Sequence, residues 1–257
     1  MMKQLPKGVL ISLFLALFLT FSPVYAQDEL LATEVSIRAE DGLSLQGFWF
    51  PVDNNRPSVI LLHEMYSNHT SWTPLIYPLV QSGYNVLAID LRGMGKTGGR
   101  MNWPAAVQDV QAWLNWLRNE AGVRGDAISI IGSSIGSNLA VVACGNDTAC
   151  RTAIAISPGW SYYGIGVEQA LKEQMIDRSV YVIYAERDRW PKLGVPLMQE
   201  AAAGEVVYQT FPGNTHGMKL FKFLPDPVLD EAGNVVSQDE TPLIVHFILN
   251  WLASKGS

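Results

Sequence analysis

The sequence predicts a single α/β domain, with a mostly parallel sheet of eight strands and helices on both faces. Short apolar runs of strand length alternate with helix-like segments along the chain. The runs are continuous rather than alternating in polarity, as expected of strands buried on both faces. A strong hairpin signal, Asp41-Gly42, precedes this alternation. Two antiparallel strands should therefore lead into the parallel part of the sheet.

The boundaries of the expected elements follow from the length and composition of each segment. Strands are expected at 33–39, 43–50, 58–63, 85–90, 127–132, 152–157, 179–185 and 206–211. Helices are expected at 104–120, 135–143, 166–175, 191–202 and 241–253. Open sheets of this kind bind ligands at the carboxyl ends of their strands, so residues that follow each apolar run are candidates for chemistry.

The first 26 residues have the organisation of a secretory signal peptide. Lys3 and Lys7 form a basic start, residues 9–21 are almost wholly apolar, and Ala26 ends a segment typical of a cleavage site. The apolar run is short for a membrane span, although an uncleaved anchor is the alternative. Cleavage after Ala26 would leave a domain of residues 27–257. We expect the protein to be secreted or periplasmic, without a stable membrane anchor.

Composition and charge narrow the range of partners. The formal net charge is −6, and the sequence has neither a basic run nor a basic helix face. Nucleic acids and anionic membrane surfaces are therefore poor candidates. The sequence implies no metal and no organic cofactor, and it leaves the oligomeric state open.

One segment combines a tight turn with a potential nucleophile. Gly132-Ser133-Ser134-Ile135-Gly136 fits the pattern G-x-S-x-G with Ser134 at its centre, after an apolar strand and before a helix. In this motif a strained strand-to-helix turn exposes the serine hydroxyl, while the glycines let the strand and the helix approach closely. A plain glycine-rich turn is the alternative.

Two further residues follow predicted strands in the order that a hydrolytic triad needs. Asp188 comes after the strand 179–185, and His216 comes after the strand 206–211. A serine becomes a useful nucleophile when a histidine takes its proton, and a carboxylate fixes the tautomer of that histidine. Glu186, in the same turn as Asp188, is the alternative acid.

Five segments resemble the motifs of α/β-hydrolases, and the resemblance covers residues 33–254. The matching segments are LLHEMYS, DLRGMGKT, GSSIG, AERD and NTHG. The chain is most similar to the compact dienelactone-hydrolase-like esterases, because of its His63-Glu64 pair and the short stretch after its SPG segment. Those enzymes usually carry a cysteine nucleophile, so Ser134 favours general ester hydrolysis over lactone specificity.

The resemblance implies a role for each matching residue. Ser134 would be the nucleophile, His216 the general base and acid, and Asp188 the orienting acid. The backbone N–H groups of Met65 and Ile135 would form the oxyanion hole. Possible site-lining residues are His63, Glu64, Tyr66, Trp160, Tyr162, Tyr163 and Trp190. We expect His63 to brace its loop rather than to catalyse.

Cys144 and Cys150 are the only two cysteines of the sequence. Export favours a disulfide between them, and the chain-entropy model assigns a loop this short roughly 2.4 kcal/mol of stabilisation. Two free thiols or a metal pair are the alternatives, although nothing nearby supplies further metal ligands.

Together these observations predict a secreted serine hydrolase that cleaves small-molecule carboxylic esters through an acyl-enzyme. A thioesterase, a lactone hydrolase, a peptidase and a non-catalytic binding protein are the alternatives. Only residues 158–178 separate two expected strands where many α/β-hydrolases insert a cap, so we expect no large cap domain and a preference for short acyl chains. Residues 219–240 form an insertion that is expected to be a rim loop, a lid or a mobile segment.

Overall fold

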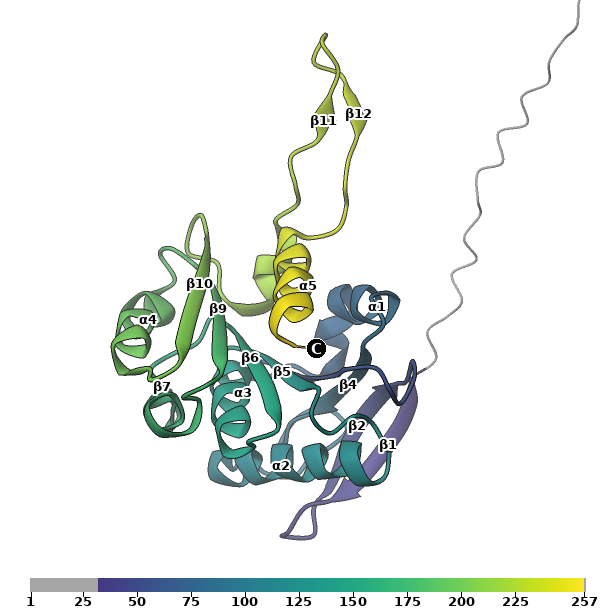
Figure 1. Cartoon of the computed structure of the whole chain (residues 1–257), viewed down its shortest axis with the longest axis vertical. Coiled ribbons are helices and arrows are strands. Elements are labelled where there is room, and N and C mark those ends of the chain that lie inside the picture. The colour runs from purple at the N-terminus through teal and green to yellow at the C-terminus, as the bar shows by residue number, and fades with distance from the viewer. Residues whose placement is uncertain (1–31, 257) are drawn as a thin grey trace, which may run out of the picture. The chain divides into compact units, whose positions relative to one another are not determined.

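The computed structural model describes residues 32–256, and the predicted signal peptide lies outside this range. Eight strands form one sheet in the order β1-β2-β4-β3-β5-β6-β9-β10 (Figure 1). Their bounds are β1 Thr33–Arg38, β2 Ser44–Phe50, β3 Ser58–Leu62, β4 Asn85–Asp90, β5 Ile128–Ser133, β6 Cys150–Ile156, β9 Ser179–Ala185 and β10 Glu205–Phe211. The pairs β1–β2 and β2–β4 are antiparallel and the others are parallel. The predicted fold class is confirmed.

Helices cover both faces of this sheet. The five α-helices are α1 Thr73–Gln81, α2 Trp103–Asn119, α3 Ile135–Asn146, α4 Arg189–Ala201 and α5 Leu243–Lys255. Figure 1 shows α1 and α5 on one face and α2, α3 and α4 on the other. β3, β4, β5 and β9 are buried along their whole length, which explains their uninterrupted apolar sequences.

The helix α1 was not expected from the sequence, because the segment contains two prolines, Pro74 and Pro78. Proline inside a helix removes a hydrogen bond and clashes with the preceding turn. Pro74 occupies the first turn, where no intrahelical N–H is needed. Leu75, Ile76 and Leu79 are buried, and this packing stabilises the helix despite Pro78.

Residues 158–178 hold no large cap in the described structure. They form a small hairpin of β7 Ser161–Tyr162 and β8 Ile165–Gly166, followed by the π-helix η2 Ala170–Gln174. The helix expected over 166–175 is therefore shorter than predicted, because the hairpin takes its first residues.

The insertion at 219–240 begins in the 3-10 helix η3 Gly217–Lys222 and then forms a hairpin of β11 Val228–Leu229 and β12 Val235–Ser237. Residues 226–240 are all exposed. In Figure 1 the hairpin extends away from the sheet beside α5. It does not fold over the strand ends in this structure.

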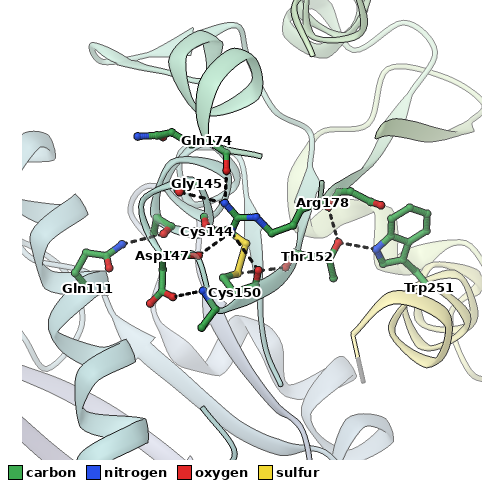
Figure 2. Close-up of a disulfide and its surroundings, with 12 residues drawn as sticks. Gln111, Cys144, Gly145, Asp147, Cys150, Thr152, Gln174, Arg178 and Trp251 are labelled. Atoms are coloured by element: carbon green, nitrogen blue, oxygen red, sulfur yellow. Dashed lines mark hydrogen bonds between the residues drawn. A yellow bond between two sulfur atoms is a disulfide. The ribbon is translucent and has the colours of Figure 1, made fainter. Parts of the chain in front are cut away.

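A disulfide joins Cys144, near the end of α3, to Cys150, the first residue of β6, with the two Cα atoms 5.2 Å apart (Figure 2). The guanidinium of Arg178 donates to the carbonyl oxygens of Cys144 at 2.6 Å, Asp147 at 2.7 Å and Cys150 at 3.1 Å. The cation thereby ties the C-terminal end of α3 to the start of β6, and its charge is favourable beside the carbonyl groups of a helix C-terminus. Formation of the disulfide in the exported protein stays a prediction.

None of the helices within residues 32–256 has the length and apolar character needed to cross a membrane.

Candidate active site

Ser134 lies at the sharp turn between β5 and α3. Its φ of 54° is in the left-handed region, which places strain on a non-glycine residue. A Cβ on Gly132 would lie 1.9 Å from the carbonyl oxygen of Gly136, and a Cβ on Gly136 would lie 2.3 Å from that of Leu62. Both glycines are thus required by the close approach of strands and helix. The turn is the nucleophile elbow that the sequence motif indicates.

The structure brings Ser134, His216 and Asp188 into one hydrogen-bonded chain. His216 Nε2 lies 2.9 Å from Ser134 Oγ, and His216 Nδ1 lies 2.7 Å from Asp188 Oδ2. Asp188 acts as acceptor only, so Nδ1 carries the hydrogen and neutral Nε2 can accept the serine proton. The three residues come from the ends of β5, β9 and β10, as the parallel topology requires.

Asp188 rather than Glu186 contacts the histidine. The Asp188 side chain is buried, whereas Glu186 is exposed. The backbone N–H of Glu186 donates to the carbonyl oxygen of Phe211, which anchors this turn to the end of β10. The burial of Asp188 suits a carboxylate whose task is to orient an imidazole.

Two side-chain acceptors, one of them on the fully buried Ser157, hold the loop that carries His216. The N–H of Gly217 donates to Ser157 Oγ at 2.9 Å, and the N–H of Met218 donates to Glu64 Oε2 at 3.1 Å. Glu64 Oε2 also accepts a hydrogen bond from Ser133 Oγ at 3.1 Å. Glu64 therefore links Ser133 to the loop that carries His216.

A pocket of about 430 Å³ opens above the nucleophile. Its lining residues are Met65, Ser134, Ser161, Tyr162, Tyr163, Trp190 and His216. Met65, Tyr162, Tyr163 and Trp190 thus lie where the sequence analysis expected. Burial, together with the negative charge of Asp188, raises the pKa of Tyr162, whose hydroxyl donates to the carbonyl oxygen of Ser157.

Four of the expected lining residues lie outside this pocket. His63 and Glu64 instead make hydrogen bonds to neighbouring segments, and Trp160 is half-buried against the hydrophobic core. Tyr66 is 83% exposed. All four residues flank strand ends in the sequence, but that position alone does not place a side chain in the pocket. Ile135 is buried at the start of α3, where its N–H follows the nucleophile directly.

His63 has the bracing role expected from the sequence. Its Nδ1 lies 2.7 Å from the carbonyl oxygen of Glu64, and its Nε2 accepts from the N–H of Leu91 at 3.0 Å. Burial lowers the pKa of His63 and favours the neutral ring. The histidine ties the end of β3 to the end of β4.

Sequence reasoning missed two residues that support the site. Ser157 has a φ of 51° and is fully buried, yet it reads in the sequence as an ordinary strand-end serine. Asn138, fully buried in α3, donates to the carbonyl oxygens of Gly159 at 2.9 Å and Ile165 at 2.8 Å. A polar residue on an otherwise apolar helix, four positions after the nucleophile, was the available signal for Asn138.

All four non-glycine residues with positive φ in the described structure belong to strand ends or turns beside this pocket: Tyr66, Ser134, Ser157 and Tyr163. Such strain persists only where the surrounding structure enforces it, and it concentrates at functional sites. Within residues 32–256, no cluster of three or more histidine, cysteine or acidic residues has the arrangement of a metal site.

A family model described as the α/β hydrolase fold matches residues 57–180. The chain therefore has the α/β-hydrolase fold. Among solved structures, the esterase Pf2001 of Pyrococcus furiosus has a TM-score of 0.67 at 19% identity, with 88% of this chain and 91% of that chain aligned. This similarity concerns the fold. Assignment to the dienelactone-hydrolase-like branch stays a prediction.

Two of the curated relatives illustrate how much of this chain is matched. The uncharacterised protein YfhR of Escherichia coli O157:H7 is 32% identical over 168 residues, which cover 62% of this chain and 57% of YfhR. The thiohydrolase aneE of Aspergillus aculeatus is 24% identical over 166 residues, which cover 63% of this chain and 50% of aneE. The match therefore spans about half the length of each relative.

Proposed function

We propose that this α/β-hydrolase cleaves carboxylic esters by a serine mechanism with an acyl-enzyme intermediate. The supporting observation is the hydrogen-bonded chain from Ser134 through His216 to buried Asp188. A non-catalytic binding protein would not need all three groups in this arrangement.

In the first half of the proposed reaction, His216 Nε2 takes the proton of Ser134 as Oγ attacks the ester carbonyl carbon. Asp188 stabilises the imidazolium that forms. The N–H groups of Met65 and Ile135 would donate to the oxyanion. The tetrahedral intermediate then expels the alcohol, which takes the proton from His216, and leaves Ser134 acylated.

In the second half, a water molecule attacks the acyl carbon while His216 Nε2 takes one of its protons. Collapse of the second tetrahedral intermediate releases the carboxylic acid and returns that proton to Ser134 Oγ. The cycle consumes one ester and one water and needs no cofactor.

Loss of the nucleophile or the base tests this proposal. Ser134→Ala and His216→Ala should each lower kcat on p-nitrophenyl acetate by about 10⁴-fold or more, and the double variant should be little worse than either. A fluorophosphonate probe should label the wild type and not Ser134→Ala. A wild type that stays unlabelled and hydrolyses no ester would favour the binding-protein alternative.

Thioester hydrolysis is the second candidate, because the relative aneE is a thiohydrolase. The same triad can attack the carbonyl carbon of an ester or of a thioester, so relative rates must distinguish the two activities. Comparison of kcat/KM for ethyl thioacetate and ethyl acetate, each corrected for alkaline hydrolysis, decides between them. We further propose that the mature enzyme is secreted or periplasmic, as the first 26 residues suggest.

A further inference from the structure

The turn of the β7–β8 hairpin carries an aromatic side chain on strained backbone. Its two central residues, Tyr163 and Gly164, have φ values of 51° and 85°. Turns of this kind favour Asn-Gly, because a left-handed conformation is unfavourable for a bulky residue. Tyr163 is 63% exposed, so burial does not compensate that strain.

Neighbouring groups hold this exposed ring in place beside the nucleophile. Tyr163 stacks on Trp103 with ring centroids 5.6 Å apart and an interplanar angle of 27°. Asn138 bonds to both sides of the hairpin, at Gly159 and Ile165. Since Asn138 belongs to the helix that starts after Ser134, the hairpin is fixed relative to the nucleophile.

A second exposed ring lines the same pocket from a distant part of the chain. Trp190 lies at the start of α4, two residues after Asp188, and is 51% exposed. The ring of Tyr162 packs against it edge-on, with centroids 6.3 Å apart, and the guanidinium carbon of Arg189 lies 5.2 Å from its centroid. Trp190 and Tyr163 both line the pocket that contains Ser134 and His216.

Exposed aromatic faces that are held rigid can stack on another ring with little loss of side-chain entropy. We propose that Tyr163 and Trp190 form an aromatic subsite, which binds a flat ring carried by the ester substrate. This inference rests on the proposed ester hydrolysis at Ser134 and assigns its substrates to the esters of aromatic alcohols or aromatic acids. The pocket volume of about 430 Å³ accommodates one such ring with a short second substituent.

Two pairs of unactivated esters test the subsite. Benzyl acetate is compared with cyclohexylmethyl acetate, and methyl phenylacetate with methyl cyclohexylacetate, so that each pair differs only in the flatness and π system of the ring. The two pairs distinguish a ring on the alcohol from a ring on the acid. In Tyr163→Asn, which keeps a residue that tolerates positive φ, the aromatic-to-alicyclic ratio of kcat/KM should fall about three- to tenfold in at least one pair.

Trp190→Leu should lower the same ratio, and Tyr163→Phe should retain the wild-type ratio because it keeps the ring. Tyr77→Asn serves as the matched control, since Tyr77 is 44% exposed on α1 and does not line the pocket. Its ratio should equal that of the wild type. Ratios that stay within twofold of the wild type in both pairs, for both Tyr163→Asn and Trp190→Leu, would overturn the aromatic subsite.

Failure of the subsite is distinguishable from failure of the hydrolase proposal. If Ser134→Ala hydrolyses the four esters as fast as the wild type, the proposed reaction is wrong. Binding of benzyl alcohol to the Ser134→Ala variant, followed by ligand-observed NMR, tests the subsite without turnover. Benzyl alcohol should bind more tightly than cyclohexylmethanol, and Tyr163→Asn in the same background should remove the difference. Equal binding of the two alcohols would overturn the subsite.

Discussion

Gly217, the residue after His216, is the most informative position for a single small substitution. Its φ is 59°, and a Cβ built on it would lie 2.0 Å from Glu64 Oε2 and 3.0 Å from Ser133 Oγ. Its N–H also holds the loop to Ser157 Oγ at 2.9 Å. Gly217→Ala therefore adds one methyl group where the loop of His216 meets its two supports.

The expected effect follows from these distances. Contacts of real Cβ atoms are essentially never below 3.0 Å, so relief of the 2.0 Å contact needs a shift of about 1 Å. Glu64 cannot move freely, because its Oε2 accepts from both Ser133 and Met218. Either the loop moves or Met218 loses its acceptor, and both displace His216. A misplacement of about 1 Å costs on the order of 100-fold in rate, so kcat should fall about 100-fold.

The assay is kcat on p-nitrophenyl acetate, with the free energy of unfolding measured in urea. Gly213→Ala is the matched control, since Gly213 lies in the same loop, has a φ of 92° and has nothing within 4 Å of a built Cβ. Both variants should lose about 1–2 kcal/mol of stability from the left-handed alanine. Only Gly217→Ala should lose kcat in addition.

A Gly217→Ala enzyme with the kcat of Gly213→Ala would refute this account of how the histidine is positioned. The double variant Gly217→Ala/Glu64→Ala adds an independent check. Removal of the carboxylate abolishes the 2.0 Å contact, so the losses in kcat from the two single variants should not add. Additive losses would show that Gly217 and Glu64 act separately.

Four further predictions follow from the site and the fold. Asp188→Asn should lower kcat by about 10⁴-fold, and Glu186→Gln should have little effect. A larger loss of kcat in Glu186→Gln than in Asp188→Asn would show that Glu186 is the acid that orients His216. Replacement of Cys144 and Cys150 by alanine should lower the free energy of unfolding by about 2.4 kcal/mol and Tm by roughly 5–10 °C in calorimetry, while kcat is retained. Free thiols in mass spectra of the exported, non-reduced protein would rule the disulfide out. Across p-nitrophenyl acetate, butyrate, octanoate and palmitate, kcat/KM should not rise beyond the short acyl chains. The reason is that an uncapped pocket buries few methylene groups, each of which contributes about 0.8 kcal/mol when buried, and a steady rise to palmitate would contradict this. Burial lowers the pKa of His63, so its neutral ring stabilises the fold above the ordinary pKa of about 6.5, and this contribution is lost as pH falls from there toward the lowered pKa. In urea unfolding, His63→Gln should therefore lose less stability on acidification than the wild type. Equal losses in the two proteins would contradict this.

Most of the fold could be read from the sequence because its central strands are buried on both faces. That burial demands uninterrupted apolar runs, and the eight expected segments coincide with the eight strands of the sheet. The helix α1 could not be read in this way. Pro78 argues against a helix on local grounds, and only the burial of Leu75, Ile76 and Leu79 against other elements outweighs it.

The sequence by itself also determined which residues could carry chemistry. Ser134 is identified by the glycine spacing of a turn that no other residues can form, and Asp188 and His216 by their places after parallel strands, which bring them to one edge of the sheet. These signals are local or follow from topology alone. The sequence order of the three residues is therefore enough to predict that they meet.

The tertiary structure alone decided which neighbouring side chains face the nucleophile. Trp160 and Tyr163 are three positions apart in one short segment, yet one packs on the core and the other lines the pocket. Glu64 lies beside Ser133 and Met218 rather than in the pocket. Such choices depend on backbone φ and ψ at turns and on contacts between segments far apart in the chain. A sequence pattern of period 2 or 3.6 carries no information about them, because a loop has no fixed period.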